Sequence, residues 1–188
     1  MSREKHPVWT VYDRLRTARL NCKYYGRRLQ QHERLEFYLQ LLLLTTAPSS
    51  AVAGLWFWAV PAGQLIWQYT GVAAAMVAVV KPLLGLTKKI KDYEAILSGY
   101  RILDYDLMEI KSSIEKKQKY DRAAQAEFDK ALQRERTLVS RNPEAREQRA
   151  LIEKCQAEVL AELPTDSFFV PDEKEIENAG TSKAVADA

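Results

Sequence analysis

The chain reads FYLQLLLLTTAPSSAVAGLWFWAVPAGQLIWQYTGVAAAMVAVV from Phe37 to Val80, and this stretch contains no Asp, Glu, Lys, Arg or His. All 28 basic and 25 acidic residues of the 188-residue chain therefore lie outside it. A helix needs roughly 20 apolar residues to cross a bilayer core about 30 Å thick. The stretch is long enough for two such helices and predicts a transmembrane hairpin. A soluble bundle with an apolar central hairpin is the competing interpretation.

The position of the turn has two solutions. We expect a first span over Phe37–Val60, a tight turn at Pro61-Ala62-Gly63, and a second span from Gln64 to Leu86. Aromatic residues flank this turn on both sides, as at a membrane interface: Trp56, Phe57, Trp58, Trp67 and Tyr69. The alternative places the turn at Pro48, with a second span over Leu55–Val80. We favour a kink at Pro48, because the alternative would put a proline and a glycine inside a helix.

Basic residues predict the orientation of the hairpin. They lie at both of its outer ends and not at the turn: Arg27, Arg28, Arg34, Lys81, Lys88, Lys89 and Lys91. Cytoplasmic flanks of membrane helices carry an excess of Lys and Arg, so both termini are expected in the cytoplasm. Cys22 and Cys155 form no closely spaced pair, which fits a reducing compartment.

Small and polar residues within the two spans suggest how the helices pack. Small residues recur four apart, a spacing that lets helix backbones approach closely in lipid: Ala47 and Ala51, Ser50 and Gly54, Gly71 and Ala75. They serve packing within one hairpin or assembly between several hairpins, and the sequence leaves both open. Polar groups at depth face protein or water, so four residues are expected to line a pore, to form interhelical hydrogen bonds or to lie at the membrane interface: Thr45, Ser49, Gln64 and Gln68.

The segment before the hairpin is predicted to be an amphipathic helix. Its apolar residues recur about every 3.5 positions: Val8, Val11, Tyr12, Leu15, Ala18, Cys22, Tyr25 and Leu29. The opposite face is basic and includes Arg16, Arg19, Lys23, Arg27 and Arg28. This face suits anionic lipid headgroups or an anionic nucleotide. Packing of the helix against the rest of a cytoplasmic domain is an equally good interpretation.

The segment after the hairpin predicts three more helices. A long helix from Thr87 carries an apolar seam typical of a bundle or coiled coil: Ile90, Tyr93, Leu97, Tyr100, Leu103, Leu107, Ile110 and Ile114. It is expected to break near Lys119–Asp121, and Asn142-Pro143 interrupts the next helix before a last one over Glu144–Leu163. Phe168-Phe169-Val170 is expected to dock on the bundle or on a partner. The predicted divisions are thus 1–36 (basic arm), 37–86 (hairpin), 87–163 (cytoplasmic helical domain) and 164–188 (flexible tail).

No pattern in the chain indicates an enzyme. There is no Gly-rich phosphate loop and no GxSxG motif, and His6 and His32 stand without metal ligands at a suitable spacing. We therefore expect no catalytic residue, no metal and no cofactor. A net charge of +3 is also too small to predict nucleic-acid binding.

The layout resembles the SLATT family, two-transmembrane effector domains associated with nucleotide-synthesising systems in bacteria. The shared features extend over about residues 8–163. They are Trp9 in the first helix, Arg27-Arg28 and Arg34-Leu35-Glu36 before the hairpin, Lys81-Pro82 after it, Tyr93 and Tyr100 on the long helix, and Cys155-Gln156.

The resemblance implies an all-α fold and a membrane-disrupting or pore-forming effector of antiphage defence. Such a protein oligomerises in the bacterial inner membrane and causes cell death or growth arrest. The implied control is a cyclic nucleotide bound by the chain itself, or a nucleotide-synthesising partner protein. Two alternatives remain: a membrane-anchored coiled-coil scaffold that recruits a partner, and a small channel subunit.

Overall fold

The computed structural model describes residues 6–46, 61–144 and 147–171, and this part of the chain contains helices and no strand. The helices are α1 (Val8–Thr46), α2 (Pro61–Leu84), α3 (Leu86–Lys117), α4 (Arg122–Val139), α5 (Arg149–Glu162) and the short 3-10 helix η4 (Thr165–Ser167). The prediction of an all-α chain is confirmed. The chain divides into two compact units, which we call the helical unit (1–25 and 96–188) and the hairpin unit (26–95). Both α1 and α3 contribute to each unit.

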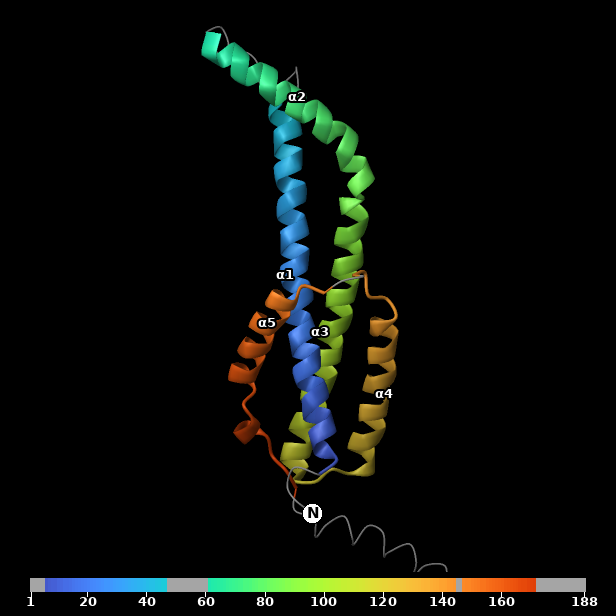
Figure 1. The fold of residues 1–188 in the computed structure, drawn as a ribbon. Helices are drawn as coiled ribbons and strands as arrows, with labels where there is room; N and C mark the ends of the chain where they lie inside the picture. Colours follow the sequence, from blue (N-terminus) through green and yellow to red (C-terminus); the bar gives the residue numbers. More distant parts are fainter. Residues whose placement is uncertain (1–5, 47–60, 145–146, 172–188) are drawn as a thin grey trace, which may run out of the picture. The chain divides into compact units, whose positions relative to one another are not determined.

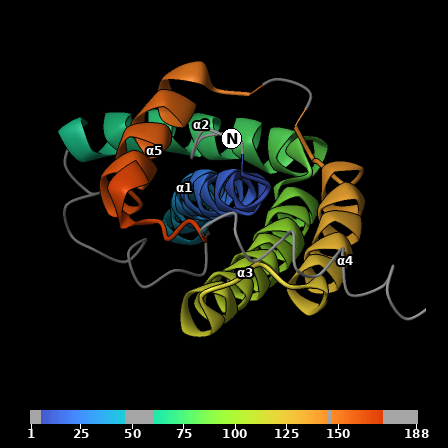
Figure 2. The ribbon, with the colours of Figure 1, turned by 90° about the horizontal axis from the view of Figure 1, so that it is seen from below.

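The helical unit is built around the N-terminal part of α1. This part lies between α5 and α3, and α4 packs along α3 (Figure 1 and Figure 2). Most apolar positions predicted from the helical period on the first and the long helix are buried in its core: Val8, Val11, Tyr12, Leu15, Ala18, Tyr25, Leu97, Tyr100, Leu103, Leu107, Ile110 and Ile114. Phe128 and Leu138 on α4 and Cys155 and Val159 on α5 are buried as well. Burial of this seam is the main force that holds the unit together.

The break between α3 and α4 lies where the sequence predicts it. Gln118 adopts a left-handed conformation, with φ of 56°, directly after α3 ends at Lys117. Asp121 then caps α4, because its side chain accepts a hydrogen bond of 2.8 Å from the backbone N–H of Ala124.

Helix α5 begins at Arg149, later than the predicted Glu144. Three hydrogen bonds involve the described residues just before α5. The Tyr24 hydroxyl donates to Glu144 and accepts from the backbone N–H of Gln148 at 3.1 Å. The side chain of Asn142 accepts from the backbone N–H of Glu144 at 2.9 Å. In a helix that began at Glu144, the Gln148 N–H would donate to the Glu144 carbonyl, whereas here it donates to Tyr24.

The predicted turn at Pro61-Ala62-Gly63 is wrong, because these residues form the first turn of α2. Proline is well tolerated at the first helical position, where its missing N–H would have no partner. Since no three-residue link joins the helices, they need not run antiparallel, and α2 crosses the C-terminal end of α1 obliquely (Figure 1). The choice between a kink and a turn at Pro48 falls in 47–60, outside the described residues.

The junction between α2 and α3 combines a proline with a glycine. Pro82 lies inside the last turn of α2, and Gly85 has a φ of 57°, a left-handed conformation that favours glycine. The two helices meet there at an angle of 44°.

Candidate membrane interface

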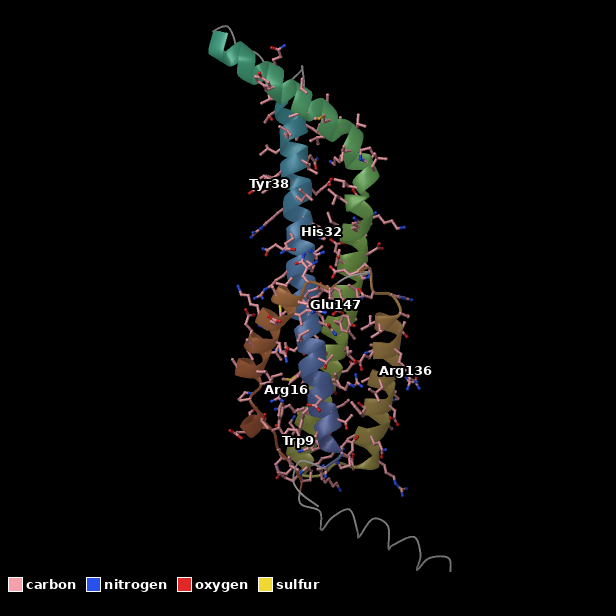
Figure 3. All side chains as sticks on the ribbon, viewed as in Figure 1. Trp9, Arg16, His32, Tyr38, Arg136 and Glu147 are labelled. Carbon is pink, nitrogen blue, oxygen red and sulfur yellow. The ribbon has the colours of Figure 1, made fainter. Side chains whose placement is uncertain are left out.

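The hairpin unit exposes large apolar side chains that a folded core would normally bury. On α1 they are Leu35, Phe37, Tyr38, Leu41 and Leu44, and on α2 they are Tyr69, Val72, Met76, Val79, Val80, Leu83 and Leu84. We call this set the apolar surface. Exposed fractions reach 68% at Val79 and 81% at Leu83, and Figure 3 shows Tyr38 pointing outward from α1. Exposed apolar areas of this kind mark contacts with a membrane or another protein.

The contacts that hold the hairpin unit together lie beside its charged residues. Lys81 on α2 forms an ion pair of 3.0 Å with Glu36 on α1. The His32 ring packs against Tyr93 with centroids 4.8 Å apart, on the side of α1 that faces α3 (Figure 3). The Arg28 guanidinium lies 5.9 Å from the same tyrosine ring. Aromatic, cation–π and ionic contacts therefore tie α1 to α2 and to the start of α3.

The predicted packing residues of α2 are not buried against the described helices of this unit. Gly71 and Ala75 are exposed, and Ala74 is buried instead. A Cβ added at Gly71 would meet no described atom within 4 Å. Close packing by Gly71 and Ala75 is thus not used between the described parts of the hairpin. The other predicted packing residues lie outside the described residues: Ala47, Ser50, Ala51 and Gly54.

The predicted pore-facing residues have different surroundings. The Thr45 hydroxyl donates to the carbonyls of Leu41 and Leu42 in its own helix, at 3.0 and 3.1 Å. Hydrogen bonds of this kind to the preceding turn are common for Ser and Thr in helices. Gln68 is exposed, whereas Ser49 and the side chain of Gln64 lie outside the described part of the chain.

Three residues of the predicted basic face bind other elements of the helical unit. Arg16 binds the residue after α5, Arg19 binds α3, and Lys23 binds α5. Arg16, labelled in Figure 3, donates through Nε and Nη2 to the carbonyl of Leu163, at 3.1 and 2.7 Å. Arg19 pairs with Asp104 at 2.8 Å, and Lys23 with Glu162 at 2.6 Å.

The same ion pairs affect the titration of these groups. The hydrogen bond that Arg19 donates to Asp104 raises the pKa of Arg19, and the one that Lys23 donates to Glu162 raises the pKa of Lys23. The other two predicted basic residues, Arg27 and Arg28, belong to the hairpin unit, where both are half-buried. Arg28 also donates to Gln31 at 2.9 Å. Arg16, Arg19 and Lys23 therefore carry out the packing role that the sequence left as one of its alternatives.

The segment after α5 closes the helical unit with an aromatic cluster. Phe168 is buried and stacks on Tyr12 with centroids 4.3 Å apart, and Trp9 meets it edge-on at 6.0 Å. The Arg16 guanidinium lies 4.9 Å from the Phe168 ring, and the Tyr12 hydroxyl donates to the Phe169 carbonyl at 2.6 Å. Docking of the Phe168 segment on the bundle is confirmed. Its partners were not predicted, and the only signal was an apolar triplet in a polar tail.

The helical unit offers no reactive thiol among the described residues. Burial raises the pKa of Cys22 to about 12, and Cys155 is fully buried. A thiol with a raised pKa holds little thiolate and reacts slowly. The described residues also contain no cluster of His, Cys, Asp and Glu able to hold a metal ion.

Comparisons with family models, curated proteins and solved structures give no match for this chain. Within the described residues, no single helix has the length and apolar character needed to cross a bilayer. One bent pair of helices, Gln68–Leu84 with Leu86–Lys117, meets both criteria when taken together.

Proposed function

We propose that this protein is a membrane-embedded effector whose hairpin enters the bilayer and, by self-association, raises its permeability. The observation that carries the proposal is the reversed distribution of apolar side chains. They are buried in the helical unit, whereas in the hairpin unit the apolar surface is exposed. Exposure of that much apolar area in water is costly, at about 25 cal/mol for each Å². Lipid removes this cost.

The charge distribution supports the same placement. No charged residue occurs between Phe37 and Val80, and the ion pair of Glu36 with Lys81 lies at the two edges of this stretch. Helix α2 has 24 residues, about 36 Å at 1.5 Å per residue, and among the described residues it meets the length and apolar criteria for a span of about 30 Å only together with α3. The proposed first span extends past Thr46 into 47–60, beyond the described residues.

Self-association is supported by the open face of α2. Gly71 and Ala75 lie four apart and are exposed, and a Cβ added at Gly71 would meet no described atom within 4 Å. Small residues at this spacing let two helices approach in lipid, where burial of apolar area gives no driving force. In this proposal α2 presents that face to α2 of another copy.

The resemblance to SLATT proteins extends the proposal to a biological role. In that role the protein lies in the bacterial inner membrane with both termini cytoplasmic, and it acts in antiphage defence when a nucleotide signal changes. The helical unit would then lie in the cytoplasm, where it or a partner receives the signal. Nothing in the described geometry assigns a nucleotide-binding residue.

A membrane anchor that recruits a partner is the second candidate, and one experiment separates the two. The full chain is expressed in bacteria with a membrane-impermeant fluorescent dye outside the cells. An effector admits dye, and Gly71→Leu abolishes the entry by blocking close helix approach. Val72→Leu, on the same helix, serves as the matched control and is expected to keep it. Membrane localisation without dye entry in any variant would support the anchor and overturn the effector.

A further inference from the structure

A hollow of about 420 Å³ lies at the junction of α2 and α3, within the hairpin unit. The junction exists because Pro82 has no N–H to continue α2 and Gly85 takes a left-handed conformation. Leu86 then starts α3, so the chain bends around an open space. The volume falls within the range of about 300–1,000 Å³ that is typical of small-ligand sites.

The lysines of this hollow have unequal roles. Lys81 is held by Glu36 at 3.0 Å, so this pair is close to neutral as a unit. Lys88 also lines the hollow, is exposed, and forms no ion pair with any carboxylate among the described residues. Thr87, beside it, adds a hydroxyl that can donate or accept. The hollow therefore carries a net positive charge centred on Lys88, which favours an anion.

The apolar side of the hollow continues into the apolar surface. Pro82 and the buried Leu86 line it. Leu83 and Leu84 of the apolar surface lie between Pro82 and Gly85 in the chain. A site that is cationic on one side and apolar on the other matches a phospholipid, whose phosphodiester directly follows its acyl chains. The charge-free stretch of the chain also ends here, at Lys81, where headgroups are expected if the hairpin spans a bilayer.

We infer that this hollow binds the headgroup of an anionic phospholipid, with Lys88 and Thr87 on the phosphodiester and with Pro82 and Leu86 against the glycerol and the first acyl carbons. The inference rests on the proposed membrane function and adds a specific lipid site to it. Glu36 also lines the hollow and weakens the site, because its carboxylate pairs with Lys81 and adds a negative charge. Binding of lipid at the α2–α3 junction would fix the bend between these helices.

The test uses the purified full chain in nanodiscs made of phosphatidylcholine with phosphatidylglycerol, followed by native mass spectrometry of the lipid that stays bound. Lys88→Ala is expected to lower retained phosphatidylglycerol about tenfold, the effect of losing one charge-assisted hydrogen bond. Lys89→Ala is the matched control. It removes the same charge from the next residue, which is exposed but does not line the hollow, and retention is expected to change less than about twofold.

Two further variants sharpen the result. Lys88→Arg keeps the charge and is expected to restore retention, and Glu36→Gln frees Lys81 and is expected to raise it. Equal losses for Lys88→Ala and Lys89→Ala would show diffuse attraction to the surface and overturn the site, while the membrane function would stand. A wild-type chain that enters no nanodisc would overturn both.

Discussion

Two glycines in helix interiors show how differently the two units are built. A Cβ added at Gly99, in the helical unit, would lie 2.2 Å from Cδ2 of Leu138, so this residue lets α3 and α4 pack tightly. At Gly71, in the hairpin unit, the same atom would meet no described atom within 4 Å. The first glycine is needed by a contact inside the protein. The second lies on a face that the described residues leave without a partner.

The same contrast holds for larger side chains. In the helical unit apolar residues are buried and basic residues such as Arg16 and Arg19 bind groups of the same unit. In the hairpin unit apolar residues such as Met76 and Val79 are exposed. Burial of apolar side chains, as in the first pattern, is favourable when the surroundings are water. Exposure of apolar side chains, as in the second pattern, is favourable when the surroundings are themselves apolar. The following experiments test this difference between the two units.

The largest expected effect comes from placing charge on the apolar surface. Met76→Asp combined with Val79→Asp should abolish membrane association, because an aspartate in a membrane helix costs about 3 kcal/mol. The matched control is Ile102→Asp with Tyr105→Asp, at the same spacing on α3 in the helical unit, where both residues are also exposed. This control should remain in the membrane fraction on centrifugation. Retention of both double variants would contradict the contrast.

A smaller effect is expected from the aromatic cluster of the helical unit. Phe168→Ala removes a buried ring stacked on Tyr12 and should lower the free energy of unfolding by about 3 kcal/mol. Phe169→Ala keeps the carbonyl that accepts from the Tyr12 hydroxyl and should cost clearly less. Urea unfolding of the full chain, followed by far-UV circular dichroism, measures both. Equal costs would mean that the stacked ring does not hold this segment.

The two glycines give the next test. Gly99→Ala should destabilise the helical unit by about 1 kcal/mol, since the cost of moving the Leu138 side chain exceeds the gain in helix propensity. Gly71→Ala has room for the methyl group and gains helix propensity, so no loss of stability is expected. Thermal unfolding in detergent compares the two variants. A stable Gly99→Ala protein would show that the α3–α4 contact adjusts freely.

The smallest effect concerns the cap of α4. Asp121→Ala should cost about 1 kcal/mol. The hydrogen bond from Ala124 lowers the pKa of Asp121 below its ordinary value, so its contribution is complete above about pH 4 and is lost as the pH falls through the lowered pKa. Asp121→Asn also caps the helix, but without this pH dependence. Unfolding midpoints at pH 7 and pH 3 test whether the cap weakens as the pH falls. The prediction is wrong if the midpoints of wild type and Asp121→Asn change equally between the two pH values.

Local patterns in the sequence predicted the helices well. The seam from Leu97 to Ile114 follows the helical period, and the break before Asp121 follows from residues that adopt turns and caps. The turn at Pro61 was predicted wrongly, because proline is compatible both with a turn and with the start of a helix. Contacts such as Arg16 with Leu163 could not be predicted, since they join segments far apart in the chain. The same limit applies to the hollow beside Lys88.

Cysteine accessibility in intact bacterial membranes tests the central claim most directly. The two native thiols provide a low background, since Cys22 has a raised pKa and Cys155 is buried. If the apolar surface lies in lipid, a Met76→Cys variant stays unlabelled by a polar maleimide until detergent is added. A Tyr105→Cys variant is labelled as soon as the reagent reaches the cytoplasm. Equal labelling of both variants before detergent would contradict the account.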